Sequence, residues 1–283
     1  MIQGEHLTHK QEMLVALCRK YDVEIVKASE MNKEYECVGF VQAYNEEKHA
    51  PAFHSNIMKF ADALVFLDDG SVDNTAAAFM DDAVIIHVKR NNNSAFDDFA
   101  NRCLLFDIAK IINTKWLLFL DLDERLDLRY LKAFKSLLRK NNVELVRFRY
   151  VHLWDSDNKF RADYPYSNNG VQYRLKMMRK KESMQLNYNS KLHFELQPYE
   201  STLVLCSPIL IIHWGNLKES DRRRRYNNYK KLDPHNESQS SYEHLISEDV
   251  ILRNVKELYK VNFLSFVKKV KAQFQNYLTC SIR

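Results

Sequence analysis

Clusters of acidic and amide side chains follow three apolar segments of this 283-residue sequence. They are YNEE at 44–47, DDGSVDNT at 68–75 and DLDE at 121–124. Carboxylate oxygens suit hard divalent cations, and a spacing of two on an extended chain points Asp121 and Asp123 to opposite sides. Each cluster alone has an ordinary explanation as a solvated turn or a helix cap. Three clusters in this order are harder to explain as separate turns, and they favour one shared site.

The apolar segments before these clusters predict the strands that position them. Thr8 and Gln11 have capping-box spacing at the start of a helix that ends near Tyr21. Strands that alternate with helices along the rest of the first half predict an α/β fold, in which a mostly parallel sheet is flanked by helices. Ligands of such sheets bind beyond the carboxyl ends of the strands, so the three clusters are expected to line one crevice. Strands are predicted at 37–43, 63–67, 83–88 and 116–120, and helices at 50–60, 74–80 and 96–112.

The composition excludes several classes of function. The 42 basic and 37 acidic residues leave a net charge of only +5, which predicts a mixed surface and no nucleic-acid partner. The five cysteines include no CxxC pair, which argues against a disulfide framework or a zinc site and favours a cytoplasmic protein. The five glycines form neither GxGxxG nor GxxxxGK, so no Rossmann cofactor site or P-loop is expected. No signal peptide or membrane span is expected, because the longest apolar run, 203–212, is short and contains Pro208.

The three clusters, in this order, resemble those of the family-2 glycosyltransferases, which are nucleotide-sugar-dependent enzymes of the GT-A fold. The resemblance covers roughly residues 37 to 232. It implies that Asp69 accepts a hydrogen bond from the nucleobase, that Asp121 faces the ribose and that Asp123 binds a divalent metal, Mn²⁺ or Mg²⁺. The nucleotide-binding residues that it implies are Ala43, Tyr44, Asn45, Glu47, Asp68, Asp69 and Asp121.

The chemistry of a sugar diphosphate agrees with this assignment, because the leaving group needs its developing negative charge neutralised. His213, in the segment IIHWGN, is the candidate for a second protein ligand to the metal, although a lone histidine beside a buried strand is more often structural. Arg222 opens the run Arg222–Arg225 and is a candidate to clamp the diphosphate. A solvated helix face is the ordinary explanation of that run.

The general base is the least determined part of the site. Many family members carry a Glu-Asp pair at the acceptor side, whereas the pair here, Glu248 and Asp249, falls too late in the chain. Glu195, in the segment KLHFEL, is the first candidate for the residue that takes the proton of the acceptor hydroxyl. Asp163 is the second, in the segment HLWDSDNKFRAD, which resembles an acceptor-side segment and equally suits a surface hairpin.

These observations predict a domain order and a function. Residues 1–35 are expected to form an N-terminal helical extension, 36–232 a GT-A domain whose nucleotide-binding half ends near 127, and 233–283 a C-terminal helical tail. The tail interleaves apolar residues with lysines, which predicts packing on the domain or peripheral contact with an anionic membrane at its inner face.

The predicted reaction is an inverting transfer of a sugar from a nucleoside-diphosphate sugar to a hydroxyl of a glycan or lipid-linked acceptor. By family analogy, it belongs to cell-envelope polysaccharide or lipopolysaccharide biosynthesis. One alternative is a nucleotidyltransferase, although the segment AYNEEKHAP lacks the glycine of a phosphate loop. Another is a non-catalytic module that binds a nucleotide or a glycan. The oligomeric state stays open.

Overall fold

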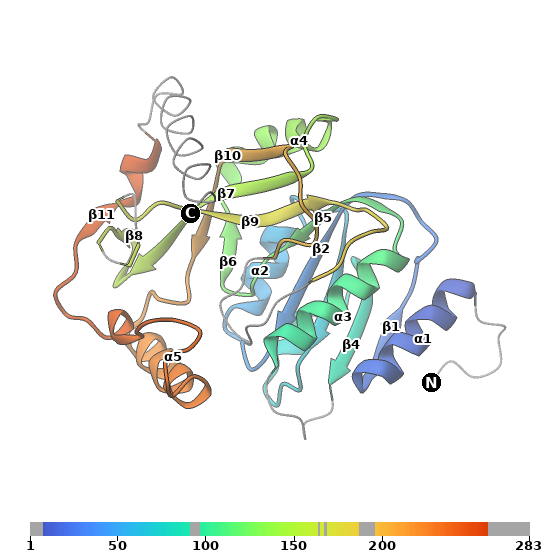
Figure 1. The fold of residues 1–283 in the computed structure, drawn as a ribbon, viewed down its shortest axis with the longest axis horizontal. Helices are drawn as coiled ribbons and strands as arrows, with labels where there is room; N and C mark the ends of the chain where they lie inside the picture. The colour runs from blue at the N-terminus through green and yellow to red at the C-terminus, as the bar shows by residue number, and fades with distance from the viewer. Residues whose placement is uncertain (1–7, 91–96, 164, 167–168, 187–195, 260–283) are drawn as a thin grey trace.

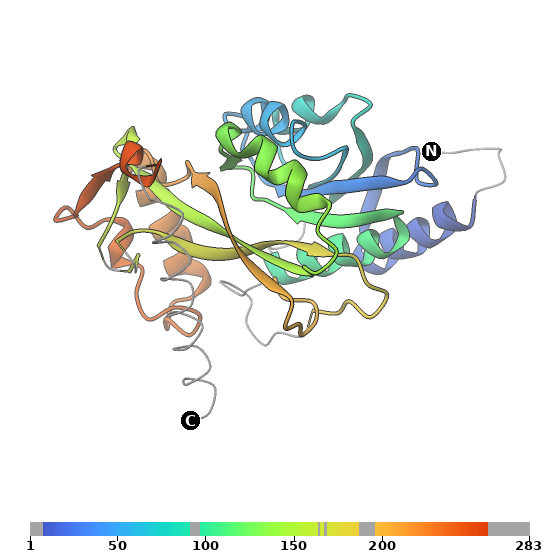
Figure 2. The ribbon, with the colours of Figure 1, turned by 90° about the horizontal axis from the view of Figure 1, so that it is seen from above.

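The structure is a computed structural model that describes residues 8–90, 97–163, 165–166, 169–186 and 196–259. It confirms the predicted α/β class: one large mixed sheet is flanked by helices on both faces (Figures 1 and 2). The main sheet has the strand order β1-β4-β3-β2-β5-β9-β7-β10-β6, and β8 and β11 extend it beside β7.

The α-helices are α1 (His9–Tyr21), α2 (Ala50–Ile57), α3 (Asp98–Ile111), α4 (Leu131–Leu138) and α5 (Glu219–Leu232). The strands of the first half are β1 (Val23–Ala28), β2 (Tyr35–Ala43), β3 (Ala63–Asp68), β4 (Val84–Arg90), β5 (Thr114–Phe119) and β6 (Glu124–Leu126). The later strands are β7 (Leu145–Trp154), β8 (Ser156–Arg161), β9 (Gln172–Arg179), β10 (Val204–His213) and β11 (Leu252–Asn254). Short 3₁₀ helices are η1 (Thr75–Phe79), η2 (Leu128–Tyr130), η3 (Glu243–Leu245) and η4 (Val255–Tyr259).

The amino-terminal half of the sheet is the parallel part that the sequence predicts. Strands β4, β3, β2 and β5 are parallel neighbours, so their carboxyl ends share one edge. The second half is mixed, because β9 runs antiparallel to both β5 and β7 whereas β10 runs parallel to β7. Strand β10 carries a bulge between Ser207 and Leu210, beyond which His213 pairs directly with His152 of β7.

Two apolar layers hold the helices on the sheet. On the face of α1 and α3, Phe40 and Phe106 stack on Phe119, with ring centroids 4.9 and 4.5 Å away. On the face of α2 and α4, Phe66 stacks on Phe79 at 4.0 Å. Burial of each such ring is worth about 1.5–3 kcal/mol. These layers make the strand ends a rigid support for the polar segments that follow them.

The expected N-terminal extension contains a strand as well as a helix. Thr8 caps α1 in the predicted capping box with Gln11. Strand β1 then pairs antiparallel with β4 and forms the edge of the main sheet, while α1 packs on α3. Residues 9–28 are therefore an integral part of the sheet and its cover.

The segment after α5 is mostly irregular as far as the structure describes it. Up to Tyr259 it contains η3, β11 and η4, and β11 pairs with β8. The predicted amphipathic helix, from about Tyr242 to Arg283, lies for the most part outside the described residues. Within the described part of the chain, no helix is long and apolar enough to cross a membrane.

Candidate functional site

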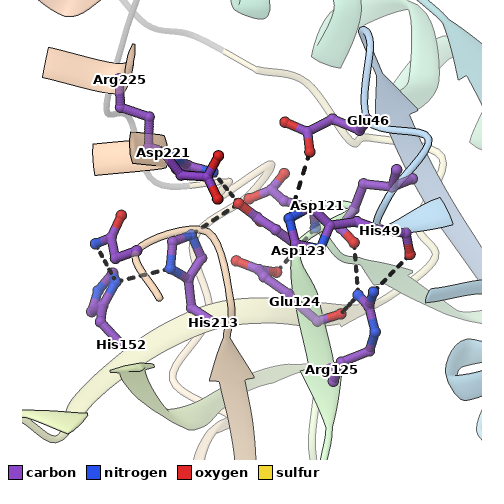
Figure 3. Close-up of polar contacts among 12 residues, drawn as sticks. Glu46, His49, Asp121, Asp123, Glu124, Arg125, His152, His213, Asp221 and Arg225 are labelled. Carbon is purple, nitrogen blue, oxygen red and sulfur yellow. Dashed lines mark hydrogen bonds and ion pairs between the residues drawn. The ribbon is translucent and has the colours of Figure 1, made fainter. Parts of the chain in front are cut away.

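The D-x-D segment turns the chain sharply at the end of β5. Leu120 N–H still donates to Phe40 of β2, and Glu124 N–H then donates to the Asp121 carbonyl at 2.9 Å. The turn leads into β6, and it points Asp121 and Asp123 towards different partners, as their spacing predicts (Figure 3). The segment therefore divides the site into an Asp121 side and an Asp123 side.

Asp123 is a buried carboxylate that faces an imidazole and a guanidinium. His213 Nε2 lies 3.2 Å from Asp123 Oδ2, and Arg225 Nη2 donates to the same oxygen. Burial opposes ionisation of Asp123, but His213 and Arg225 outweigh it and hold its pKa well below the usual value. Gly215 makes this approach possible, because a Cβ there would collide with both Asp123 and Arg225. Asp123 is therefore ionised and compensated by positive charge.

His152 fixes the orientation of the His213 ring from the neighbouring strand. The two residues pair in the ladder of β7 and β10, and their Nδ1 atoms lie 3.1 Å apart. Asn216 Nδ2 lies 3.3 Å from the same His152 nitrogen and donates to it. With His152 Nδ1 as the acceptor, His213 Nδ1–H is the donor, so that His213 Nε2 is the nitrogen directed at Asp123.

Asp123 and His213 have the donor chemistry and spacing to share a divalent cation. Two ligands about 2.1 Å from one ion and at right angles to each other lie about 3.0 Å apart, close to the 3.2 Å between these atoms. No cluster of three or more His, Cys, Asp or Glu residues suited to a metal occurs among the described residues. The protein thus offers two donors, and substrate phosphates and water would complete the shell, as is usual for Mg²⁺.

The Asp121 side is a network of fixed ion pairs. Arg102 of α3 bonds Asp121, and Lys176 of β9 lies 3.1 Å from Asp121 and 2.7 Å from Glu124. Tyr150 donates to Glu124 at 2.7 Å. Burial opposes the charge on Asp121, but Lys176 and Arg102 outweigh it and lower its pKa. Burial raises the pKa of Glu124 despite the neighbouring lysine.

The loop after β2 reaches the Asp123 side, as the shared crevice requires. Burial, together with the charge of Asp123, raises the pKa of Glu46. Arg125 holds the loop by donating to the His49 carbonyl at 2.7 Å (Figure 3). Helix α5 is tied to the same loop through Lys48 and Asp221, whose charged atoms lie 2.5 Å apart.

The other residues implied in nucleotide binding lie at the ends of β2 and β3. The Asp69 side chain is 5% exposed and accepts from Arg90 at 2.9 Å. Asp68 caps the turn by accepting from the backbone of Ser71 at 2.7 Å. Asn45 Oδ1 accepts from the backbone N–H of Val72, and Glu47 accepts from that of Asn74, so both link the two loops. Ala43 is buried at the end of β2, and Tyr44 is 52% exposed beside it.

A cavity of about 600 Å³ opens between the D-x-D segment and the second half of the chain. Its walls come from β7, β9 and α5 and from residues 238–245. Asp121 and Glu124 line one end, together with His213 and Arg225. The carboxylates of the crevice, which are balanced by cations, therefore face a space large enough for a sugar.

The arginine that reaches the site is Arg225, whereas Arg222 lies elsewhere. Arg222 Nη1 donates to the Asn216 carbonyl at 2.9 Å, its Nη2 pairs with Asp155, and its guanidinium stacks on Trp154. Residues three apart share a face of a helix, so α5 directs Arg222 and Arg225 inward at different heights. The helical period of the arginine run is the sequence signal that distinguishes Arg222 and Arg225 from Arg223 and Arg224.

The two base candidates differ in what the structure says of them. Asp163 pairs with Arg161 through both carboxylate oxygens, at 2.8 and 2.9 Å, and Arg161 stacks on Trp154. The segment 152–163 is thus the expected hairpin, formed by β7 and β8, with Trp154 buried between two arginines. Glu195 lies outside the described residues, but its neighbour Leu196 lines the cavity.

Three contributors to the site were not foreseen from the sequence. They are a buried lysine in a strand, a buried arginine on a helix, and a histidine opposite another histidine. The unusual feature of Lys176, a charge within the run YRLKMM, was visible in the sequence. The other two, Arg102 and His152, depend on which strands and helices pack together.

Comparison with known proteins gives structural likeness only. No family model matches the sequence, and no curated protein matches it. Among solved structures, S. aureus TarS residues 1–349 in complex with UDP is 17% identical, with a TM-score of 0.35 over 41% of this chain and 36% of that chain. The mannosyltransferase PcManGT from Pyrobaculum calidifontis, in complex with GDP-Man and Mn²⁺, is 14% identical, with a TM-score of 0.31 over 48% and 46%.

A further TarS structure, again of residues 1–349, is 10% identical, with a TM-score of 0.39 over 75% of this chain and 69% of that chain. The first two matches thus span less than half the length of the proteins they align with. At TM-scores this low, the likeness assigns neither donor nor acceptor. The case for function therefore rests on the residues of the crevice.

Proposed function

We propose that this protein is a metal-dependent glycosyltransferase of the family-2 type, which transfers a sugar from a nucleoside-diphosphate donor to a hydroxyl of an acceptor. One observation carries the proposal: beyond the carboxyl ends of β2, β3 and β5, Asp123 contacts His213 and Arg225, and these two residues line a sugar-sized cavity. A carboxylate, an imidazole and a guanidinium are the groups that a metal-bound diphosphate requires.

The residues at the Asp123 end divide the work on the diphosphate. Asp123 and His213 Nε2 would hold Mn²⁺ or Mg²⁺, which supplies charge neutralisation for the leaving group. Arg225 has a buried Nε without a hydrogen-bond partner and is 21% exposed, so its guanidinium has donors left for phosphate oxygens. Arg225 replaces the Arg222 that the sequence suggested for this role.

The nucleoside would lie over the ends of β2 and β3. Asp121 is 38% exposed, so its carboxylate keeps room to accept from ribose hydroxyls while Arg102 and Lys176 hold it ionised. Arg90 holds Asp69 beside Ala43 and Tyr44, and these residues would contact the nucleobase. Fixed ion pairs orient both carboxylates before the donor arrives, which reduces the entropy lost on binding.

Transfer with inversion needs a base on the acceptor side. The acceptor oxygen forms a bond to the anomeric carbon while the bond from that carbon to the diphosphate oxygen breaks, and the hydroxyl proton passes to a carboxylate. We assign this role to Glu195, because Leu196 beside it lines the cavity. Asp163 is less suited, since Arg161 neutralises it and lowers its pKa against the effect of burial.

The biological setting follows from the resemblance and forms part of the proposal. It is cell-envelope polysaccharide or lipopolysaccharide assembly in the cytoplasm, on a glycan or lipid-linked acceptor, with peripheral membrane contact through the tail. The division into 1–35, 36–232 and 233–283 is proposed with it.

The test is a screen of UDP-, GDP- and CDP-sugars for nucleotide release, with Mn²⁺ and with excess EDTA. We expect one nucleoside diphosphate to raise the melting temperature only when the metal is present, because a ligand of the native state stabilises it by mass action. Equal stabilisation in EDTA would contradict the metal assignment. Binding without release from any donor, across a panel of acceptors, would favour a non-catalytic module.

Glu195→Gln tests the base. The amide keeps the shape of the side chain, so we expect unchanged donor affinity and a kcat that falls roughly 10²–10⁴-fold, the usual contribution of general-base catalysis. Asp163→Asn is the matched control and should retain turnover. The opposite result would assign the base to Asp163.

A further inference from the structure

The charges that line the cavity are balanced at one end and unbalanced at the other. At the D-x-D end, Arg102, Lys176 and Arg225 each pair with a carboxylate. The other wall carries Arg174, whose Nε and Nη2 donate only to Gln172 Oε1, at 3.2 and 2.9 Å. No described carboxylate lies within ion-pair distance of Arg174. It is the one cation among the described lining residues without a counter-charge.

The strand geometry separates Arg174 from the diphosphate position. Gln172, Arg174 and Lys176 all line the cavity, and the pairing of β9 with β7 shifts register between Leu175 and Met177, so a β-bulge separates Arg174 from Lys176 along the strand. Lys176 reaches Asp121 and Glu124, whereas Arg174 bonds Gln172 in the opposite direction along the strand. The Arg174 guanidinium therefore lies outside the group of ion pairs around Asp121.

The cavity lining includes neutral polar side chains beside the charged ones, among them Tyr166, Gln172 and Asn216. Neutral hydroxyls do not require a guanidinium, whereas a phosphate or a carboxylate matches its planar pair of donors.

We propose that Arg174 is the centre of an anion subsite, and that the acceptor is a molecule carrying a phosphate or a carboxylate group close to the hydroxyl that is glycosylated. The role of the bound molecule as an acceptor rests on the proposed function, whereas the anion subsite itself does not depend on it. Gln172 Oε1 holds the guanidinium in place and leaves Nη1 and one N–H of Nη2 for the anion.

The experiment titrates three small sugars into the full chain by calorimetry: glucose 6-phosphate, glucuronate and glucose. The probes share a ring and differ in charge, so the first two separate a phosphate from a carboxylate. Each titration is repeated in Arg174→Gln and in Arg139→Gln, an exposed arginine of the α4 terminus that serves as the matched control. A fourth protein, Arg225→Gln, reports on the diphosphate end.

We expect at least one anionic sugar to bind about tenfold or more tightly than glucose, as charge-assisted hydrogen bonds to a guanidinium allow. Arg174→Gln should reduce its affinity to that of glucose, and Arg139→Gln should not. Equal affinity for all three sugars, or no detectable anion binding by the wild type, would overturn the proposal. So would a preference that survives in Arg174→Gln and disappears in Arg225→Gln.

The outcome is separable from that of the proposed function. Arg174→Gln should keep metal-dependent binding of the nucleoside diphosphate, which depends on the other end of the cavity. If the protein binds no nucleotide but shows the Arg174-dependent preference, the anion subsite is supported and the glycosyltransferase proposal is contradicted. If it binds nucleotide but shows no preference for an anionic sugar, the glycosyltransferase proposal stands and the subsite is contradicted.

Discussion

Asp121 and Asp123 lie two residues apart, yet the protein surrounds them with different kinds of counter-charge. Asp121 meets Arg102 and Lys176, two cations on a helix and a strand of the rigid sheet layers, and is 38% exposed. Asp123 is 7% exposed and meets an imidazole and the end of one long side chain from α5. The ion pairs around Asp121 maintain a fixed charge, whereas a metal ion can take the place of the positive charges around Asp123. One motif therefore contains a structural half and an exchangeable half.

Asp123→Asn should produce the largest effect, because it removes the exchangeable half. The amide keeps the volume of the side chain but loses the negative charge that a cation requires. We expect Mn²⁺-dependent affinity for the nucleoside diphosphate to fall by about 100-fold or more, measured by calorimetry, and turnover to be lost. Far-UV circular dichroism should be unchanged, since the residue follows the strand. Retained turnover would remove the metal role from Asp123.

Lys176→Met should show that the Asp121 half is structural. It leaves Glu124 buried without its lysine, and we expect the free energy of unfolding to fall by about 3 kcal/mol at neutral pH, from urea denaturation. Lys115→Met, in an exposed ion pair with Glu36, is the control and should cost about 0–1 kcal/mol. A similar small loss for both variants would contradict the structural role.

The pH dependence of Lys176→Met provides a second measurement. Burial already raises the pKa of Glu124, and removing the lysine raises it further. A carboxyl whose pKa is higher in the folded state than in the unfolded state takes up a proton on folding, so stability rises as the pH falls through the folded pKa. We therefore expect the deficit relative to wild type to shrink on moving from pH 8 towards pH 5. A deficit that grows on acidification would contradict this reading of Glu124.

His152→Leu should have the smallest effect, a reduced metal affinity, and His152→Gln provides its control. It removes the acceptor for His213 Nδ1–H, and groups that orient a metal ligand typically contribute 10–100-fold in metal affinity. We expect roughly a tenfold weaker Mn²⁺ affinity in the presence of nucleotide, followed by electron paramagnetic resonance. His152→Gln restores an acceptor oxygen and should recover most of the loss. No recovery would indicate that His152 acts through packing alone.

The sequence predicts the Asp121–Asp123 segment well and its surroundings poorly. The strands β2, β3 and β5 are short apolar runs with clear ends, so the edge where their polar segments meet follows from the parallel pattern. Arg225 and Lys176 are different, because their roles depend on the rotation of α5 and on the pairing of β9 with two antiparallel neighbours. These are tertiary choices that local propensity does not determine. Strand β1 was missed for a related reason, since half-buried edge strands carry a weak apolar pattern.

The bulge in β10 has a consequence for how this gene can vary. The two residues between Ser207 and Leu210 set the frame in which all later residues of the strand face the sheet, down to His213. Because side chains alternate between faces, loss of one position before His213 would turn its side chain away from Asp123 and bring Trp214 to that place instead. Deletion of Pro208 alone would therefore disable the site from a distance, whereas substitutions there would be tolerated. The spacing between this bulge and the histidine is therefore a stricter requirement of the site than the identity of Pro208.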